Sequence, residues 1–239
     1  MDGKEIIKEL KLLSSEKYKK NVVKLGIPES NSIGVCTGDI RKLAKSISKS
    51  NELAFELWGT GYHEAKLLAV LLFDKKTLNF DDINSLMNEV YSWDLCDHIC
   101  KNLIIKLKNY EQLILNWSSL DKTYFKRGMY TLIASAAIHE KNISEESIVL
   151  FLQLIRDNSF DEREHVKKAA SWALREIGKR NFELQERALL LAYDLKNSND
   201  KTQIWIGKDA LKELETLVQV EERSRLISSD SKMAVVKTY

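Results

Sequence analysis

The stretch HVKKAASWALREIGKR, residues 165–180, has the spacing of one amphipathic helix. Its small residues Ala169, Ala170 and Ala173 allow another helix to pack closely against it. Trp172 and Arg175, three positions apart, share a side of the same helix. Four further segments begin an apolar helix in a similar way: HEAKLLAVLL from His63, CDHICKNLII from Cys96, FKRGMYTLIA from Phe125 and IWIGKDALKE from Ile204.

These five helix starts recur at a roughly constant spacing. In chain order they are separated by 33, 29, 40 and 39 residues, which is typical of two-helix repeats of the HEAT type. We therefore predict an all-α fold, a curved α–α solenoid of HEAT-like helical repeats. Because the repeat is degenerate, an irregular helical bundle stays open as an alternative.

The composition favours the same fold class. The 239 residues include 9 Gly and 1 Pro, too few for the many turns of a sandwich or barrel. Hydrophobic residues make up 44% and charged residues 30%, as in an ordinary globular protein. We expect a single domain over residues 1–221 and a C-terminal tail over 222–239, where the apolar periodicity weakens.

Helical periodicity covers nearly the whole chain between short loops. The expected helices are Lys4 to Leu13, Glu16 to Leu25, Thr37 to Ser48, Asn51 to Trp58, Tyr62 to Phe73, Asp81 to Tyr91, Ser92 to Lys106, Tyr110 to Trp117, Asp121 to Ile138, Glu145 to Asp157, Glu162 to Arg180, Glu183 to Leu195 and Thr202 to Glu215.

The compartment is also predicted from the sequence. No apolar run approaches the roughly 20 residues that cross a bilayer, and the charged start MDGKEIIKEL is unlike a signal peptide. Without an export signal, Cys36, Cys96 and Cys100 are expected to be free thiols in a reducing cytoplasm. We expect a cytoplasmic protein with no membrane partner.

Cations recur near the starts of the repeated helices. The formal net charge is only +2, so a nucleic-acid site needs cations gathered locally. In stacked repeats, equivalent positions line one surface, which would then be basic. The alternative is that these cations lie on ordinary solvent-exposed helix faces and bind nothing. The recurring cations are Lys66, Lys101, Arg127, Lys168 and Lys208.

Tryptophan-bearing segments supply the candidate chemistry. Trp93 and Asp97 lie four residues apart on one helix face, and a carboxylate beside an indole is costly to bury without a partner. Lys101, four residues beyond Asp97, is a candidate partner for it. Arg127 has the planar fork that suits a phosphate. In the alternative interpretation, Trp93 and Trp172 are core residues and Asp97 and Arg127 are solvated charges.

Metal and nucleotide chemistry find little support in the sequence. Cys96 and Cys100 lie one helical turn apart with His98 between them, whereas a structural zinc site normally needs four ligands. The chain contains no Walker loop, dinucleotide fingerprint or nucleophile elbow. We therefore expect no metal and no organic cofactor.

The segments IGVCTGDIRKLAKSI, SWDLCD, KRG and SWALREIGK carry a resemblance over most of residues 1–215. They resemble the DNA alkylation repair family of HEAT-like repeat proteins, the AlkD-like alkylpurine DNA glycosylases. The family's Trp, the Asp four residues later, the Arg of the next repeat and the Trp of the following one match Trp93, Asp97, Arg127 and Trp172. A second aromatic that often precedes the first Trp is Ser92 here.

The resemblance implies excision of positively charged N3- or N7-alkylated purines from double-stranded DNA, without a deep base-flipping pocket. Asp97 would stabilise the oxocarbenium character that develops on the sugar, and Trp93 and Trp172 would form an aromatic slot beside it. Phosphate contacts are expected from Arg127, Lys66, Lys168, Arg175 and Lys208 on one basic face. The protein is expected to act as a monomer.

Two other functions stay open. The first is a non-catalytic HEAT-repeat protein that binds damaged or branched DNA. The second is a helical scaffold that binds proteins on its repeat surface. A steep salt dependence of binding favours nucleic acid over protein, and release of a base separates an enzyme from a binder.

Overall fold

The computed structural model describes residues 2–235, and the protein is mostly helical (68%). The all-α prediction is confirmed, because the strands found in the described residues are only two residues long. By contact the chain divides into two compact units, Met1–Tyr110 and Glu111–Tyr239. The single domain over 1–221 stays a prediction.

Unit 1 contains seven α-helices and two short 3-10 helices within the described residues, and α8 begins at its last residue. They are α1 (Gly3–Leu12), α2 (Glu16–Lys24), η1 (Glu29–Asn31), α3 (Thr37–Lys45), α4 (Asn51–Gly59), α5 (His63–Leu72), α6 (Phe80–Asn88), α7 (Trp93–Asn102), η2 (Ile104–Lys106) and α8 (Tyr110–Ser118).

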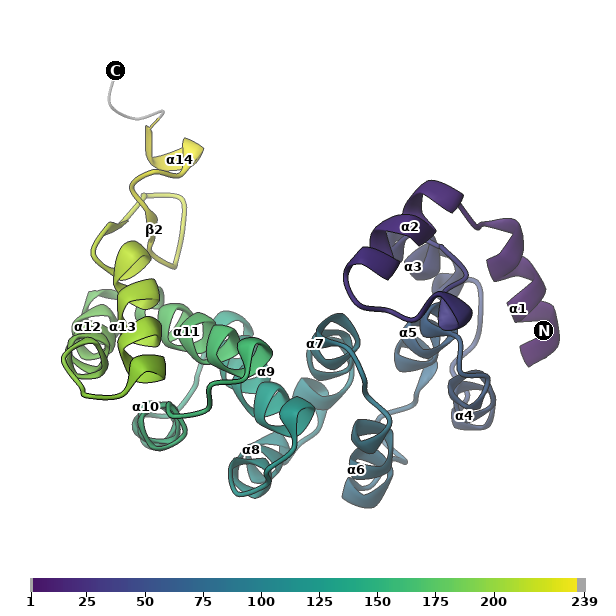
Figure 1. Ribbon diagram of the computed structural model, residues 1–239, viewed down its shortest axis with the longest axis horizontal. Helices are drawn as coiled ribbons and strands as arrows, with labels where there is room; N and C mark the ends of the chain where they lie inside the picture. The colour runs from purple at the N-terminus through teal and green to yellow at the C-terminus, as the bar shows by residue number, and fades with distance from the viewer. Residues whose placement is uncertain (1, 236–239) are drawn as a thin grey trace. The chain divides into compact units, whose positions relative to one another are not determined.

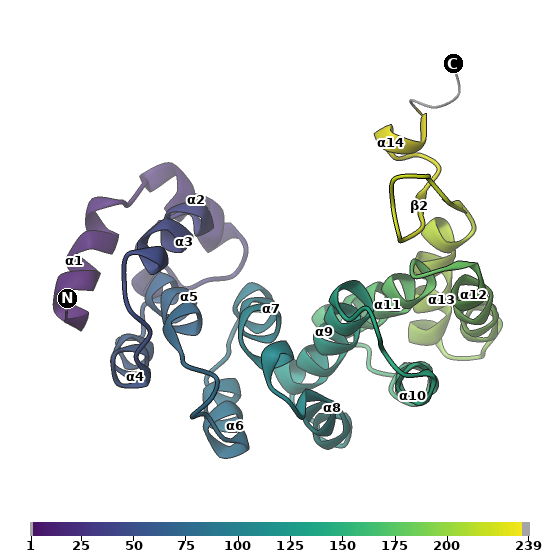
Figure 2. The ribbon, with the colours of Figure 1, turned by 180° about the vertical axis from the view of Figure 1, so that it is seen from behind.

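Helices α3, α5 and α7 pack side by side and form the inner row of unit 1. Figure 1 shows α5 and α7 in one row and α4 and α6 in the other, and Figure 2 shows the same rows from behind. Helix α5 is buried along nearly its whole length, as its apolar sequence predicts. The largest buried side chain next to it is Phe73, which meets Phe55 edge to face.

The three inner helices of unit 1 run parallel. The Glu64 carboxylate at the start of α5 accepts bonds from residues just before α3, and the Ser50 amide after α3 donates to Leu72 O at the end of α5. Likewise His63 meets Asp94 at the two starts, and His98 meets Leu67 O at mid-helix. The inner helices therefore start along one edge of unit 1 and end along the opposite edge.

Unit 2 is built on the same plan. Helix α11 packs against α9 and α13, and α12 packs against α11 and α13. Its buried aromatic residues include Trp117, Tyr130 and Phe151. After α8, its helices are α9 (Thr123–His139), α10 (Glu145–Asp157), α11 (Glu164–Gly178), α12 (Phe182–Lys196), α13 (Lys201–Leu214) and α14 (Lys232–Val235), with strands β1 (Leu217–Val218) and β2 (Ile227–Ser228) between the last two.

The C-terminal segment is docked on unit 2. Strands β1 and β2 pair antiparallel, with Leu217 opposite Ser228. Leu226 N donates to Lys179 O at 2.8 Å, and Arg225 binds Glu176 of α11. The predicted tail boundary at residue 222 falls inside this hairpin, and residues 236–239 of the tail lie outside the described residues.

One predicted helix is shorter than its sequence pattern indicates. The apolar periodicity predicts a helix from Ser92 to Lys106, whereas α7 ends at Asn102 and a separate 3-10 turn follows. The Asn102 side chain donates to His98 O at 2.8 Å and so satisfies a carbonyl of the last turn. Leu103 then departs from helical backbone angles. The other predicted helices agree with the structure apart from shifts at their ends.

The cysteine prediction is confirmed, since Cys36, Cys96 and Cys100 are all free thiols. Among residues 2–235 no helix combines the length and apolar character needed to cross a membrane. Within the same range, no three His, Cys, Asp or Glu side chains gather as metal ligands do.

Candidate functional site

The start of α7 presents the predicted Trp–Asp pair. Trp93 is the first residue of this helix and Asp97 lies one turn later, and both side chains are half-buried. The Asp97 side chain is 13% exposed, and its Oδ2 lies 3.5 Å from Lys101 Nζ. The predicted Asp97–Lys101 pair is thus present. The carboxylate is sheltered by the protein and lies beside a lysine of its own helix.

A hydrogen-bonded network fixes this helix start against α5. Asp94 Oδ2 lies 2.8 Å from His63 Nε2, and Tyr91 OH lies 3.2 Å from His63 Nδ1. Because the carboxylate only accepts, Nε2 donates and Nδ1 accepts from the tyrosine. Ser92 Oγ donates to the other oxygen of Asp94 at 2.7 Å. The network therefore orients the residues on both sides of Trp93.

The pKa of Asp94 reflects two opposed influences. Burial raises it, but hydrogen bonds from His63 and Ser92 outweigh burial, so the pKa of Asp94 lies below its usual value. Burial also raises the pKa of Tyr91. Asp94 thus stays ionised at neutral pH, and its bond to His63 holds it against α5.

Glu64 is a second buried carboxylate that the sequence analysis did not single out. It is 1% exposed, and it accepts from the backbone amides of Ile33 at 2.9 Å, Gly34 at 2.7 Å and Val35 at 3.3 Å. Three consecutive amides form a concave donor set that binds anions. Glu64 fills this set from within the protein and anchors the loop before α3.

Lys66 is not a free cation in this structure. Its side chain is 6% exposed, and its Nζ lies 2.9 Å from Glu89 Oε2. The same nitrogen lies 4.6 Å from the centroid of the Trp58 ring and 5.7 Å from that of Tyr91. The carboxylate and the two rings together offset the charge of Lys66.

In unit 2, Arg127 lies at the start of α9 and is 8% exposed. Its guanidinium donates to His165 O at 2.7 Å, which ties α9 to the first turn of α11. Trp172 is half-buried two turns further along α11, and its indole Nε1 donates to Glu176 Oε1 at 3.2 Å. Unit 2 thus holds Arg127 and Trp172 on two packed helices.

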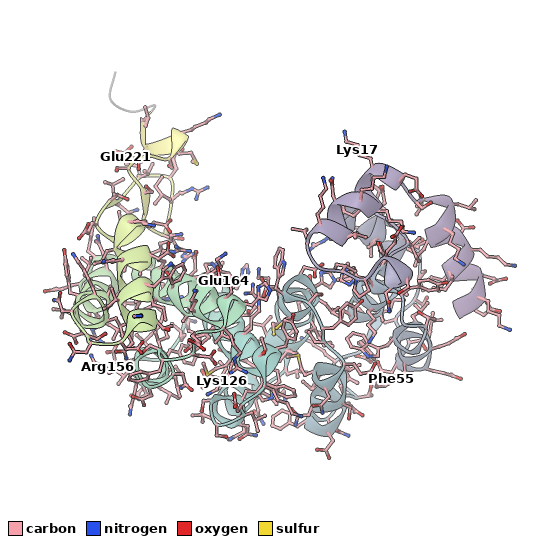
Figure 3. All side chains as sticks on the ribbon, in the orientation of Figure 1. Lys17, Phe55, Lys126, Arg156, Glu164 and Glu221 are labelled. Carbon is pink, nitrogen blue, oxygen red and sulfur yellow. The ribbon has the colours of Figure 1, made fainter. Side chains whose placement is uncertain are left out.

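Two of the predicted phosphate-binding cations of unit 2 are paired with acids. Lys168 Nζ lies 2.8 Å from Glu164, which Figure 3 labels at the start of α11. Hydrogen bonds from Lys167 and Lys168 lower the pKa of Glu164 to about 2. Arg175 lies within 3.2 Å of both Asp209 and Glu213. Lys208 is exposed, and no ion pair holds it within residues 2–235.

The predicted residues are therefore brought together as two pairs. Trp93 and Asp97 stand on one helix of unit 1, and Arg127 and Trp172 stand on packed helices of unit 2. Sequence spacing indicated Asp97 with Lys101, whereas the partners of Lys66 and Arg175 come from other helices and gave no sequence signal.

The parallel inner helices, packed in a row and backed by outer helices, define a helical-repeat protein. A family model described as "DNA alkylation repair enzyme" matches residues 6–214, and the chain belongs to that family. No curated protein matches the chain.

A solved structure shares the fold. It is described as "A new family of proteins related to the HEAT-like repeat DNA glycosylases with affinity for branched DNA structures". The two are 23% identical with a TM-score of 0.74, over 89% of this chain and 95% of that one. The prediction of HEAT-like helical pairs is thereby confirmed.

Proposed function

We propose that this protein is a DNA glycosylase that releases positively charged N3- or N7-alkylated purines from double-stranded DNA. The observation that carries the proposal is the sheltered Asp97 carboxylate, one turn from Trp93, in a chain of the DNA alkylation repair family. The proposal needs no metal and no organic cofactor, because an alkylated purine is already cationic and leaves readily.

Asp97 supplies electrostatic stabilisation. When the bond between C1′ and the purine nitrogen breaks, its electron pair goes to the base and positive charge develops on the sugar. A carboxylate aimed at that charge lowers the barrier. Water then forms the new C1′–O bond and gives up a proton to solvent or to Asp97. Lys101, 3.5 Å from Asp97, orients the carboxylate as a positioning residue.

Trp93 and Trp172 are each proposed to offer a ring face that attracts the cationic sugar and base. Arg127, Lys66, Lys168, Arg175 and Lys208 are proposed as phosphate contacts. Lys208 and Lys168 are the most exposed of these cations. Lys66 and Arg175 would have to exchange a carboxylate partner for a phosphate oxygen.

The experiment is single-turnover incubation with a duplex that contains N7-methylguanine, followed by detection of abasic sites. We expect base release by the wild-type protein. Asp97→Asn keeps the shape but loses the charge, and a transition-state interaction of about 3 kcal/mol corresponds to about a hundredfold loss of rate. Asp157→Asn, an exposed acid on α10, is the matched control and should retain the wild-type rate.

Two outcomes contradict parts of the proposal. If the wild type binds the alkylated duplex yet releases no base, the enzyme proposal fails. If Asp97→Asn releases base at the wild-type rate, another group stabilises the sugar cation. In either case the binding affinity of Asp97→Asn should stay close to that of the wild type, because the carboxylate acts chiefly in the transition state.

A second candidate function is non-catalytic binding of damaged or branched DNA. Two observations favour it: Ser92 stands where an aromatic often precedes the Trp of this family, and the structural relative is described as having affinity for branched DNA. Competition between a four-way junction and a linear duplex of the same length tests this candidate. Preference for the junction without base release would favour it over the glycosylase.

A further inference from the structure

The opposite edge of unit 1, where the inner helices end, is rich in cations. Three segments meet there: residues 40–50 after mid-α3, residues 73–79 after α5, and residues 101–109 through η2. The first and the third contain no acid, and the second contains only Asp74. Their basic residues are Arg41, Lys42, Lys45, Lys49, Lys75, Lys76, Lys101, Lys106 and Lys108.

Four of these side chains form a cluster, which we call the cationic edge: Arg41, Lys49, Lys75 and Lys106. Lys49 Nζ donates to Phe73 O at 3.3 Å, so the end of α3 lies against the end of α5. Asn51 bonds Asp74 N at 2.7 Å and Thr77 Oγ1 at 2.7 Å, which holds the two following loops together. Because α5 and α7 run parallel, η2 ends at the same edge.

The four cations of the edge repel one another. Burial, followed by the charges of Lys49, Lys75 and Arg41, lowers the pKa of Lys106. The charge of Arg41 also contributes to lowering the pKa of His98 on α7. All four residues are exposed, and none of them makes an ion pair with an acid of residues 2–235.

Cations at helix ends have an ordinary structural use, because they interact favourably with the helix dipole. One cation at each helix end would suffice for that purpose. Four neighbouring cations that make no ion pair within residues 2–235 exceed it, and a partner that brings closely spaced negative charges would relieve their repulsion. A duplex phosphate backbone carries such charges at about one per 1.7 Å of helix axis.

We propose that Arg41, Lys49, Lys75 and Lys106 form a binding surface for the phosphate backbone of duplex DNA, separate from the phosphate contacts proposed above for Lys66, Arg127, Lys168, Arg175 and Lys208. This inference rests on the proposed DNA partner and goes beyond it by naming a second surface. Contacts of this kind read no sequence, and they position the protein on its substrate.

The test is the salt dependence of binding to an unmodified duplex, measured by fluorescence anisotropy. Each phosphate contact contributes about 0.9 to the slope of log affinity against log salt. The triple variant Lys49→Gln/Lys75→Gln/Lys106→Gln should lower the magnitude of that slope by about 2.7. Over a fourfold rise in salt, the wild type should then lose about 40-fold more affinity than the variant.

Two matched variants separate position from charge. Lys4→Gln/Lys8→Gln/Lys141→Gln removes the same charge from exposed lysines elsewhere and should keep the wild-type slope. Lys49→Arg/Lys75→Arg/Lys106→Arg keeps the cations and should keep it too. If the Gln triple variant does not fold, each single Gln variant should still lower the slope by about 0.9.

The outcomes are distinguishable from those of the proposed catalysis. An unchanged slope in the Gln triple variant, or an equal loss in the Lys4/Lys8/Lys141 control, overturns this inference even if the wild type releases base. A wild type that does not bind the duplex also overturns it. A wild type with a steep slope that the Gln variant lowers, but with no base release, supports this surface and refutes only the glycosylase.

Discussion

The inner helices carry cations near their ends in both units, but the partners of these cations differ. In unit 1 the ion pairs of these cations stay within one helix, Lys42 with Asp39 and Lys101 with Asp97. In unit 2, Lys179 lies within 3.0 Å of both Glu176 and Glu213, and Arg175 binds Asp209 and Glu213. In unit 1, Lys49, Lys75 and Lys106 make no ion pair within the described residues. The formal net charge of +2 therefore does not reveal that the two units differ in how their cations are paired.

If the protein binds DNA as proposed, the pairing of cations, and not only their number, would decide which surface attracts a phosphate. An ion pair holds its cation in place and offsets its field, so a ligand must first displace the carboxylate. Helix ends with paired cations stabilise the fold. Helix ends with unpaired cations are available for a partner.

The largest expected effect comes from breaking the unit 2 network at Glu176. This residue is 7% exposed and accepts from Trp172, Lys179 and Arg225. Burial raises the pKa of Glu176, but the Lys179 and Arg225 charges outweigh burial, so its pKa lies below the usual value. Glu176→Gln should lower the free energy of unfolding, measured by urea denaturation, by about 3 kcal/mol. The substitution removes the carboxylate that Lys179 and Arg225 share, and it leaves these sheltered cations with less negative charge nearby.

Lys49→Gln in unit 1 is the control for that measurement. Its ammonium bonds only a backbone carbonyl at the surface, and the change in unfolding free energy should stay within about 0.5 kcal/mol. If both variants lose the same stability, the contrast between the two units is wrong.

The second effect concerns a buried histidine of α7 that is hydrogen-bonded to α5. His98 Nε2 lies 3.0 Å from Leu67 O, and Asn102 Nδ2 lies 3.3 Å from His98 Nδ1. Burial lowers the pKa of His98 from 6.5 to about 4. The unfolded state therefore binds the proton first, and stability present above pH 6.5 is lost as the pH falls toward 4.

This loss should amount to about 2 kcal/mol between pH 7 and pH 5. His98→Gln keeps a donor for Leu67 O but has no group that titrates there, so its unfolding free energy should lack that part of the decline. Urea unfolding at both pH values measures the difference. An equal decline in wild type and variant would assign the pH dependence to other groups.

Local patterns of the sequence predict the helices and the contacts within them. The apolar period placed α10 at Glu145–Asp157, as observed, and the four-residue spacing indicated the Asp97–Lys101 pair. Both depend only on helix geometry, which the chain carries at every position.

Contacts between helices were not predictable in the same way. The bond between His63 and Asp94 spans 31 positions, and that between Arg225 and Glu176 spans 49. These bonds depend on which residues of neighbouring repeats lie opposite one another. A repeat with a degenerate sequence pattern does not specify that alignment. For the same reason Lys66 could be recognised as a recurring cation and Arg175 as an expected phosphate contact, but the acids that pair with them could not be predicted.

A smaller effect is expected at the C-terminal hairpin, which supplies one cation of the unit 2 network. Arg225 donates to Glu176 O at 2.9 Å and to Glu176 Oε2 at 2.7 Å. Arg225→Ala should lower the free energy of unfolding by about 1 kcal/mol, less than Glu176→Gln, because Lys179 still pairs with the carboxylate. In a double-mutant cycle with Glu176→Gln, the two losses should be less than additive.

The smallest expected effect tests the repulsion at the cationic edge directly. A lysine whose pKa is lowered has a larger neutral fraction at a given pH, and the neutral amine is the form that an acylating reagent attacks. Lys106 should therefore react faster with a succinimidyl ester near pH 8 than Lys141. Peptide mapping by mass spectrometry measures both rates, and Lys141 gives the reference rate.

Burial is the largest cause of the lowered pKa of Lys106, and the Lys49, Lys75 and Arg41 charges follow it. Salt screens the repulsion between exposed cations but leaves burial unchanged. High salt, or the Lys49→Gln/Lys75→Gln variant, should thus slow acylation of Lys106 only in part, within about threefold. A duplex bound on this edge should slow it further, because phosphates favour the charged amine as well as covering it. If neither salt nor the neighbouring substitutions change the rate, burial alone sets the reactivity of Lys106, and the contrast in charge pairing between the two units loses its support at this residue.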